Sequence, residues 1–161
     1  MLNKKSVSQW VLSARSEARM MGVKDDLKKV VRLALSYSDF DFGITSGVRT
    51  AEEQNALFKK GASQLDGHIK KSRHQTGDAI DFVVYDENGK VTWDFAYYRE
   101  VSKAFKRAAA ELGVRIVWGG DWSRFKDGHT LNLPGATSYD QTGLEKARYY
   151  SSGRRACRLL H

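Results

Sequence analysis

Residues 72–85 of this chain read SRHQTGDAIDFVVY. The part from Ala79 to Tyr85 is rich in Ile, Val and aromatic residues, which predicts a strand. Asp81 lies inside this apolar run, where a buried and unpaired carboxylate would be costly. His74 precedes it by seven positions, and Gly77 between them can close a small loop. We therefore expect the side chains of His74 and Asp81 to meet.

A metal ion is one reason to keep Asp81 in such a run. A hydrolytic zinc site needs three nitrogen or oxygen ligands from the protein and a fourth position for water, and His129 is the third candidate. For an isolated His and Asp, a surface histidine and a turn-forming carboxylate would be the simpler interpretation. The apolar setting of Asp81 favours the metal.

Helices and short strands are predicted on both sides of this stretch. Helical spacing of apolar residues marks segments that end near glycines, and Thr50 with Glu53 has the form of a capping box. We expect helices over residues 7–21, 24–36, 50–60 and 97–112, and strands over 42–45, 79–85, 91–93 and 114–118, with a turn at 86–89.

The mixed order of these elements indicates an α+β fold, with a small antiparallel sheet, N-terminal helices and flanking helices. The length of 161 residues suits one domain, and no internal repeat or linker divides it. We expect a single domain over residues 1–161 with its core at about 10–133. A basic extension follows at about 134–161, and its structure is left open.

Composition limits the classes of protein that remain. Lys and Arg number 27 against 19 Asp and Glu, and the net charge of +8 favours a polyanionic partner such as nucleic acid, bacterial wall or an anionic membrane face. The chain carries no recognisable nucleic-acid-binding motif, so we expect no specific nucleic acid partner. Cys157 is the single cysteine, which excludes an intrachain disulfide. Neither a signal peptide nor a transmembrane stretch is expected.

The polar spacing in residues 72–81 resembles a family signature. Ser72-x-His74-x-x-Gly77-x-Ala79-x-Asp81 is similar to the S-x-H-x-x-G-x-A-x-D pattern of D-alanyl-D-alanine carboxypeptidase-like zinc peptidases, the VanX/VanY-type group that includes many phage endolysins. Residues 45–49 (TSGVR) resemble the upstream S-G-x-R element, and residues 117–122 (VWGGDW) resemble the segment before the last ligand. Residues 22–27 and 39–43 are closest to phage endolysin L-alanyl-D-glutamate endopeptidases. The resemblance spans about residues 10–133.

The resemblance implies a hedgehog/D-Ala-D-Ala peptidase-like fold and a Zn²⁺-dependent peptidoglycan hydrolase. Such an enzyme cuts the stem peptide, at the L-alanyl-D-glutamate bond, during host cell lysis. It further implies zinc binding by His74, Asp81 and His129, and substrate contacts by Arg49, Ser72 and Gln54. Three roles remain open for Arg49. It could pair with a substrate carboxylate, stabilise the oxyanion, or form a surface salt bridge with Glu52 or Glu53.

This sequence departs from the family pattern near the last metal-binding histidine. An acidic residue three positions before the last histidine is usual in the family, whereas Asp127 stands two positions before His129. On an extended strand, residues two apart point to the same face, so Asp127 could still act as the catalytic base beside His129. The alternatives are Asp121 as base, or no base at all.

Two other functions remain open. One is a D,D-carboxypeptidase or dipeptidase that removes terminal D-Ala, and the other is a non-catalytic wall-binding module on the same scaffold. For the endolysin we expect a monomer that accumulates in the host bacterial cytoplasm and reaches the wall on release.

Overall fold

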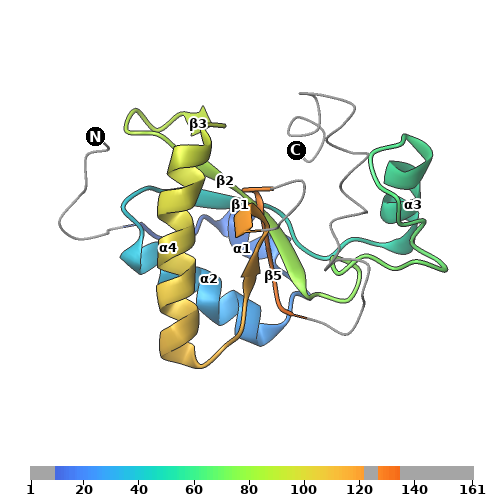
Figure 1. The fold of residues 1–161 in the computed structure, drawn as a ribbon, viewed down its shortest axis with the longest axis horizontal. Coiled ribbons are helices and arrows are strands. Elements are labelled where there is room, and N and C mark those ends of the chain that lie inside the picture. Colours follow the sequence, from blue (N-terminus) through green and yellow to red (C-terminus); the bar gives the residue numbers. More distant parts are fainter. Residues whose placement is uncertain (1–9, 122–126, 135–161) are drawn as a thin grey trace.

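A five-stranded antiparallel sheet forms the centre of the computed structural model, which describes residues 10–121 and 127–134 (Figure 1). The strands run in the order β1-β2-β5-β4, and β3 pairs with β2. The elements are α1 (Ala14–Arg19), α2 (Asp25–Tyr37), β1 (Phe42–Ser46), α3 (Ala51–Lys59), β2 (Ala79–Tyr85), β3 (Val91–Thr92), α4 (Phe95–Leu112), β4 (Val117–Trp118), a 3₁₀ turn η1 (Gly119–Asp121) and β5 (Thr130–Asn132). The expected α+β class is confirmed.

The core lies between the sheet and helices α2 and α4, which pack against each other. Alternate residues of β2 enter it: Ile80, Phe82 and Val84 are fully buried. The ring of Phe82 lies 5.0 Å from that of Phe105 and 5.5 Å from that of Tyr98. Full burial of each such side chain is worth about 1.5–3 kcal/mol. Because side chains alternate along a strand, Asp81 points to the face of β2 opposite this core.

Local sequence signals placed most helices correctly. Helix α2 matches the prediction of 24–36, and α4 ends at Gly113, which has a positive φ of 66°. Thr50 and Glu53 form the predicted capping box at the start of α3.

The predicted boundaries of two elements were wrong. The helix expected over 7–21 is reduced to α1, because the hydroxyl of Ser13 accepts a hydrogen bond from the backbone N–H of Ser16 and so begins the helix there. Residues 1–9 lie outside the described residues. The strand expected over 114–118 is limited to β4.

Strand β5 was not predicted. It has three residues and lies between β2 and β4, with Thr130 opposite Asp81, Leu131 opposite Ile80 and Asn132 opposite Ala79. A segment this short has too few residues to show a strand period. Its pairing sets which side chains face Asp81.

Helix α3 stands apart from α2 and α4, at the far side of the sheet, within the part of the chain that is described (Figure 1). It is held by the segment after β1 and by the loop before β2. None of the helices among the described residues is long and apolar enough to cross a membrane. Residues 135–161 of the basic extension are outside the described ranges.

Candidate active site

The loop that carries His74 directly precedes β2, and its conformation depends on Gly77 and Ser72. Gly77 has a φ of 76°, and a Cβ there would lie 2.6 Å from the carbonyl oxygen of Gly22, so glycine is required on both counts. Ser72 accepts a hydrogen bond from the backbone N–H of His74 (3.2 Å) through its hydroxyl. Ser72 therefore supports the turn, and its predicted contact with substrate stays a prediction.

The ring of His74 is oriented by the segment after β1. Its Nδ1 lies 3.0 Å from the carbonyl oxygen of Gly47. Because a carbonyl only accepts, Nδ1 is the donor in this bond, which leaves Nε2 as the nitrogen that faces Asp81. Nε2 lies 3.4 Å from Oδ2 of Asp81, and both side chains are buried. The backbone N–H of Arg49 also donates to the carbonyl of His74 (3.0 Å), which joins the two segments.

Asp81 is 1% exposed. Its carboxylate has polar neighbours from β5 and from the segment that follows β1. The hydroxyl of Thr130 donates to Oδ1 at 2.8 Å, and Nη2 of Arg49 lies 3.7 Å from Oδ2. A buried carboxylate needs such compensation, because its desolvation is otherwise costly. The predicted meeting of His74 and Asp81 is present in the structure.

Arg49 is held by Gln54 rather than by Glu52 or Glu53. Nη1 of Arg49 donates to Oε1 of Gln54 at 2.8 Å. The amide nitrogen of Gln54 donates to the hydroxyl of Ser63 and to the carbonyl of Leu65, both at 2.8 Å. Gln54 is fully buried, and its predicted contact with substrate stays a prediction. Its role in this structure is to position Arg49.

His129 directly precedes β5, and its ring packs against aromatic side chains. Its ring centroid is 4.4 Å from that of Tyr98 and 5.0 Å from that of Trp93. Among residues 10–121 and 127–134, no three His, Cys, Asp or Glu side chains gather into a cluster that could hold a metal. The predicted trio of His74, Asp81 and His129 is therefore not assembled among these residues, because Thr130 is the residue paired with Asp81 and the ring of His129 packs against Tyr98.

Thr130 is the site residue that the sequence did not reveal. Its hydroxyl lies 2.8 Å from Oδ1 of Asp81 and 2.7 Å from Oδ2 of Asp127. The other oxygen of Asp127 accepts from the backbone N–H of His129 (3.0 Å). The Asp127 carboxylate reaches Thr130 while the His129 ring packs against Tyr98, so the expectation that both side chains look into one site is not met. A signal was present, since Thr130 stands three positions after Asp127, the spacing at which the family has its last histidine.

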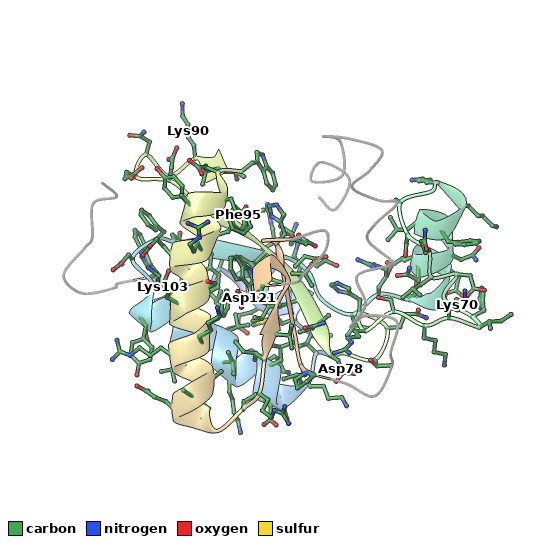
Figure 2. The ribbon with its side chains drawn as sticks, viewed as in Figure 1. Lys70, Asp78, Lys90, Phe95, Lys103 and Asp121 are labelled. Carbon is green, nitrogen blue, oxygen red and sulfur yellow. The ribbon has the colours of Figure 1, made fainter. Side chains whose placement is uncertain are left out.

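Asp121 lies away from this group. Its carboxylate forms an ion pair with Lys106 of α4 at 2.7 Å, and both side chains are about half exposed. Asp121 is labelled in Figure 2, which also shows Lys70, Lys90 and Lys103 projecting from separate parts of the molecule.

The loop between α3 and His74 is fastened by Asp66. Its Oδ1 accepts hydrogen bonds from the backbone N–H groups of His68, Ile69 and Lys70 at 2.9–3.0 Å. These backbone donors, first that of Lys70, lower the pKa of the Asp66 carboxyl. His68 itself is exposed, as expected.

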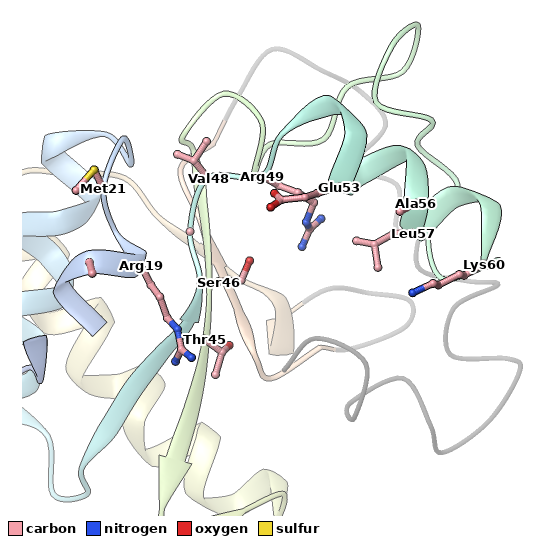
Figure 3. A pocket seen from close by; sticks show the side chains of 12 residues that line it. Arg19, Met21, Thr45, Ser46, Val48, Arg49, Glu53, Ala56, Leu57 and Lys60 are labelled. Carbon is pink, nitrogen blue, oxygen red and sulfur yellow. The ribbon is translucent and has the colours of Figure 1, made fainter. Parts of the chain in front are cut away.

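A cleft of about 600 Å³ opens beside Arg49, between α1, the end of β1 and α3 (Figure 3). Arg19 lies on one wall, and Arg49 and Lys60 lie on the α3 wall. Glu53 is the acidic residue of the lining. Three cations and one carboxylate favour an anionic ligand, because clefts focus the field of the charges that line them.

Several known proteins that are similar to this chain are named as L-alanyl-D-glutamate peptidases or endopeptidases. A family model described as phage L-alanyl-D-glutamate peptidase matches residues 8–140. The L-alanyl-D-glutamate peptidase of Escherichia phage T5 is 43% identical over 115 residues, which cover 71% of this chain and 82% of that protein. The peptidoglycan L-alanyl-D-glutamate endopeptidase CwlK of Bacillus subtilis (strain 168) is 31% identical over 122 residues, covering 66% and 73%.

A solved structure agrees with these sequence matches. The L-Ala D-Glu endopeptidase ChiX of Serratia marcescens superposes with a TM-score of 0.70 at 38% identity, covering 83% of this chain and 96% of that one. The similarity therefore extends over the described fold.

Proposed function

Since this chain belongs to the family of phage L-alanyl-D-glutamate peptidases, we propose that it is a zinc-dependent endopeptidase that cuts the L-alanyl-D-glutamate bond of peptidoglycan stem peptides. The chain is a peptidase by its family. The zinc, the residue roles and the exact bond are our proposal. The observation that supports them most is the buried pair of His74 Nε2 and Asp81 Oδ2, 3.4 Å apart beside Arg49.

The His74–Asp81 pair fits two ligands of one zinc ion. Ligands about 2.0–2.2 Å from zinc at a tetrahedral angle lie roughly 3.3–3.6 Å apart, which includes the observed separation. The bond from Nδ1 of His74 to Gly47 is the kind of outer contact that fixes the ring of a metal-binding histidine. When bound, zinc supplies Lewis acidity, which makes water nucleophilic near neutral pH and polarises the scissile carbonyl.

Asp127 is our candidate for the catalytic base. It is buried at 2% exposure and is separated from Asp81 by one hydroxyl, that of Thr130. In this position it would accept a proton from the attacking water and return it to the leaving amine, a role worth about 10²–10⁴ in rate. Asp121 is not suited to the role, because it is paired with Lys106.

Arg49 is our candidate for binding the substrate. It lines the cleft, and Gln54 fixes one of its terminal nitrogens. A guanidinium held in this way pairs well with a carboxylate, which stem peptides carry, or with a developing oxyanion. Arg19 and Lys60 would add attraction for the acidic peptide along the same cleft.

Family membership favours this function over the D,D-carboxypeptidase and the non-catalytic module. The monomeric state, the cytoplasmic accumulation before lysis and the role of the basic extension stay predictions. Peptidoglycan is the substrate named for the CwlK relative, and we propose it for this chain as well.

The test is digestion of purified peptidoglycan by the protein, with and without a chelator, beside His74→Ala and the matched surface control His68→Ala. We expect new D-Glu amino termini, lost with chelator and with His74→Ala but kept with His68→Ala. Release of free D-Ala instead would identify the carboxypeptidase. Cleavage that survives both chelator and His74→Ala would remove the zinc mechanism.

A further inference from the structure

The cleft beside Arg49 carries two further cations, Arg19 and Lys60. We propose that Arg19, assisted by Lys60, binds a second carboxylate of the stem peptide, on the residue that follows D-Glu. Arg19 thereby selects peptides in which that residue carries a free carboxylate over peptides in which it is amidated. The inference rests on the proposed function, because it names the substrate that the same site prefers.

The guanidinium of Arg19 is held along β1. Its Nη1 donates to the backbone carbonyl of Ile44 at 2.9 Å, and Figure 3 shows the side chain reaching along the strand toward Thr45. A guanidinium has five N–H donors in a rigid fork, so this bond fixes its position and leaves other donors for a ligand. Arg19 is exposed to solvent, as a group that binds an incoming peptide must be.

Close contact between α1 and the end of β1 fixes the position of Arg19 relative to the His74–Asp81 pair. A Cβ at Gly47 would lie 1.9 Å from the backbone carbonyl oxygen of Arg19, so glycine is required for this approach. The carbonyl of Gly47 lies 3.0 Å from Nδ1 of His74, and Nη2 of Arg49 lies 3.7 Å from Asp81. One short segment therefore connects Arg19 to the proposed reaction centre.

The positive charge of the cleft is available to a ligand. Arg19 and Lys60 form no ion pair with any carboxylate in residues 10–121 and 127–134. Glu53 is the acidic residue of the lining, and its carboxylate accepts a hydrogen bond from the backbone N–H of Thr50 at 2.9 Å. Figure 3 shows the side chain of Lys60 pointing from the end of α3 toward the cleft. Three cations against one engaged carboxylate attract a ligand that has more than one negative charge.

The rest of the lining fits an acidic peptide better than a nucleic acid. Met21 is 77% exposed and Val48 is 40% exposed, and both line the cleft. Such side chains suit the alkyl groups of a peptide. The described residues that line the cleft include no aromatic side chain, whereas proteins that bind single-stranded nucleic acid stack the bases on aromatic rings.

The chemistry of the substrate supplies the first carboxylate. Glutamate has two carboxyl groups and only one of them continues the chain, so the other stays free beside the scissile bond. Arg49 is the cation that contacts Asp81, and it therefore takes this first carboxylate. A second carboxylate, one residue further along the peptide, then meets Arg19 on the opposite wall of the cleft.

Two synthetic tripeptides test this preference. Both contain L-Ala, D-Glu and a C-terminal alanine, and they differ only in whether the terminal carboxylate is free or amidated. The constants kcat and KM are measured with each peptide for wild type, Arg19→Gln, Arg19→Lys, Lys60→Gln and Arg15→Gln. Arg15 is the matched control, because it is exposed on the same helix and is not among the residues that line the cleft. The melting temperature shows whether each variant is folded.

We expect wild type to have a kcat/KM about tenfold higher for the free acid than for the amide. The difference should lie in KM, because the contact is made equally in the ground state and in the transition state. Arg19→Gln should bring the ratio of the two kcat/KM values to within about twofold of one. Arg19→Lys and Lys60→Gln should each keep part of the preference, and Arg15→Gln should keep all of it.

Equal cleavage of both peptides by wild type would overturn the inference. So would an Arg19→Gln enzyme that loses rate on both peptides and keeps their ratio, because the cation would then act by general attraction alone. If Arg19→Gln does not fold, an unchanged ratio in Lys60→Gln would overturn the inference. Cleavage of peptidoglycan but of neither tripeptide would also overturn it. A wild-type protein that cleaves neither the peptides nor peptidoglycan would instead refute the proposed function, and the inference with it.

Discussion

Replacement of Gln54 by methionine should separate Arg49 from its support without leaving a cavity. The side chain of Gln54 is fully buried and makes three hydrogen bonds, to Arg49, Ser63 and the carbonyl of Leu65. Methionine has a similar length and can form none of the donor bonds. The backbone of buried Leu65 would lose its partner, at a cost of about 1–3 kcal/mol, and each other bond contributes about 0.5–1.5 kcal/mol.

We therefore expect Gln54→Met to lower the free energy of unfolding by about 2–6 kcal/mol. Urea denaturation measures this as a fall in midpoint of roughly 1–3 M, for a slope of about 2 kcal/mol per M, within the range usual for small proteins. At temperatures where the variant is folded, kcat/KM on peptidoglycan should also fall, since the Arg49 guanidinium has lost its hydrogen bond to Gln54 and is left with the 3.7 Å ion pair with Asp81. Glu52→Gln, on the exposed side of the same helix, is the matched control.

The control should stay within about 0.5 kcal/mol of wild type, as surface substitutions usually do. A Gln54→Met protein as stable as Glu52→Gln would show that the amide does not hold the loop and Arg49 together. Normal stability with a lower kcat/KM would also contradict the reasoning, because the two effects are derived from the same bonds.

Three further outcomes follow from local geometry. Thr50→Ala removes the capping box and should destabilise the protein by about 1 kcal/mol in thermal unfolding; a variant as stable as wild type would show that the cap is unimportant. Gly47→Ala should destabilise it by more, about 2 kcal/mol or above, because the new Cβ would lie 1.9 Å from the carbonyl of Arg19; a stable, active variant would contradict this contact. Asp66 has a lowered pKa in the folded state, so its stabilisation is present at neutral pH and is lost as pH falls through that value. The stability difference between wild type and Asp66→Asn should therefore be largest near pH 7 and shrink below about pH 4, and a difference independent of pH would be inconsistent with this linkage.

The parts of the fold that the sequence predicted are those with local signals. Helices α2, α3 and α4 show apolar residues at helical spacing, and their ends are marked by Thr50 and Gly113. The sequence also predicted that His74 and Asp81 lie close together, because the short loop closed by Gly77 joins them directly.

The parts that the sequence did not predict depend on strand pairing. Strand β5 is short, and its position follows from its bonds to β2, some fifty residues earlier in the chain. Whether His129 or Thr130 faces Asp81 depends on a register that must be known to a single residue, since a shift of one reverses every side chain. The burial of Gln54 likewise depends on the loop containing Leu65, which no periodic pattern marks.

Helix α3 gives the cleft two walls of different character. One wall consists of β1, a strand of the central sheet, and of α1, which packs against β1. The other is α3, which stands apart from α2 and α4 and is tied to the sheet chiefly through Arg49, Gln54 and the loop that follows (Figure 1). Regions with few core contacts open at a lower free energy than the global transition. Amide hydrogens of α3 should therefore exchange with solvent by local opening. Those of β2 should exchange only when the whole domain unfolds. The width of the cleft can then vary without disturbing the His74–Asp81 pair.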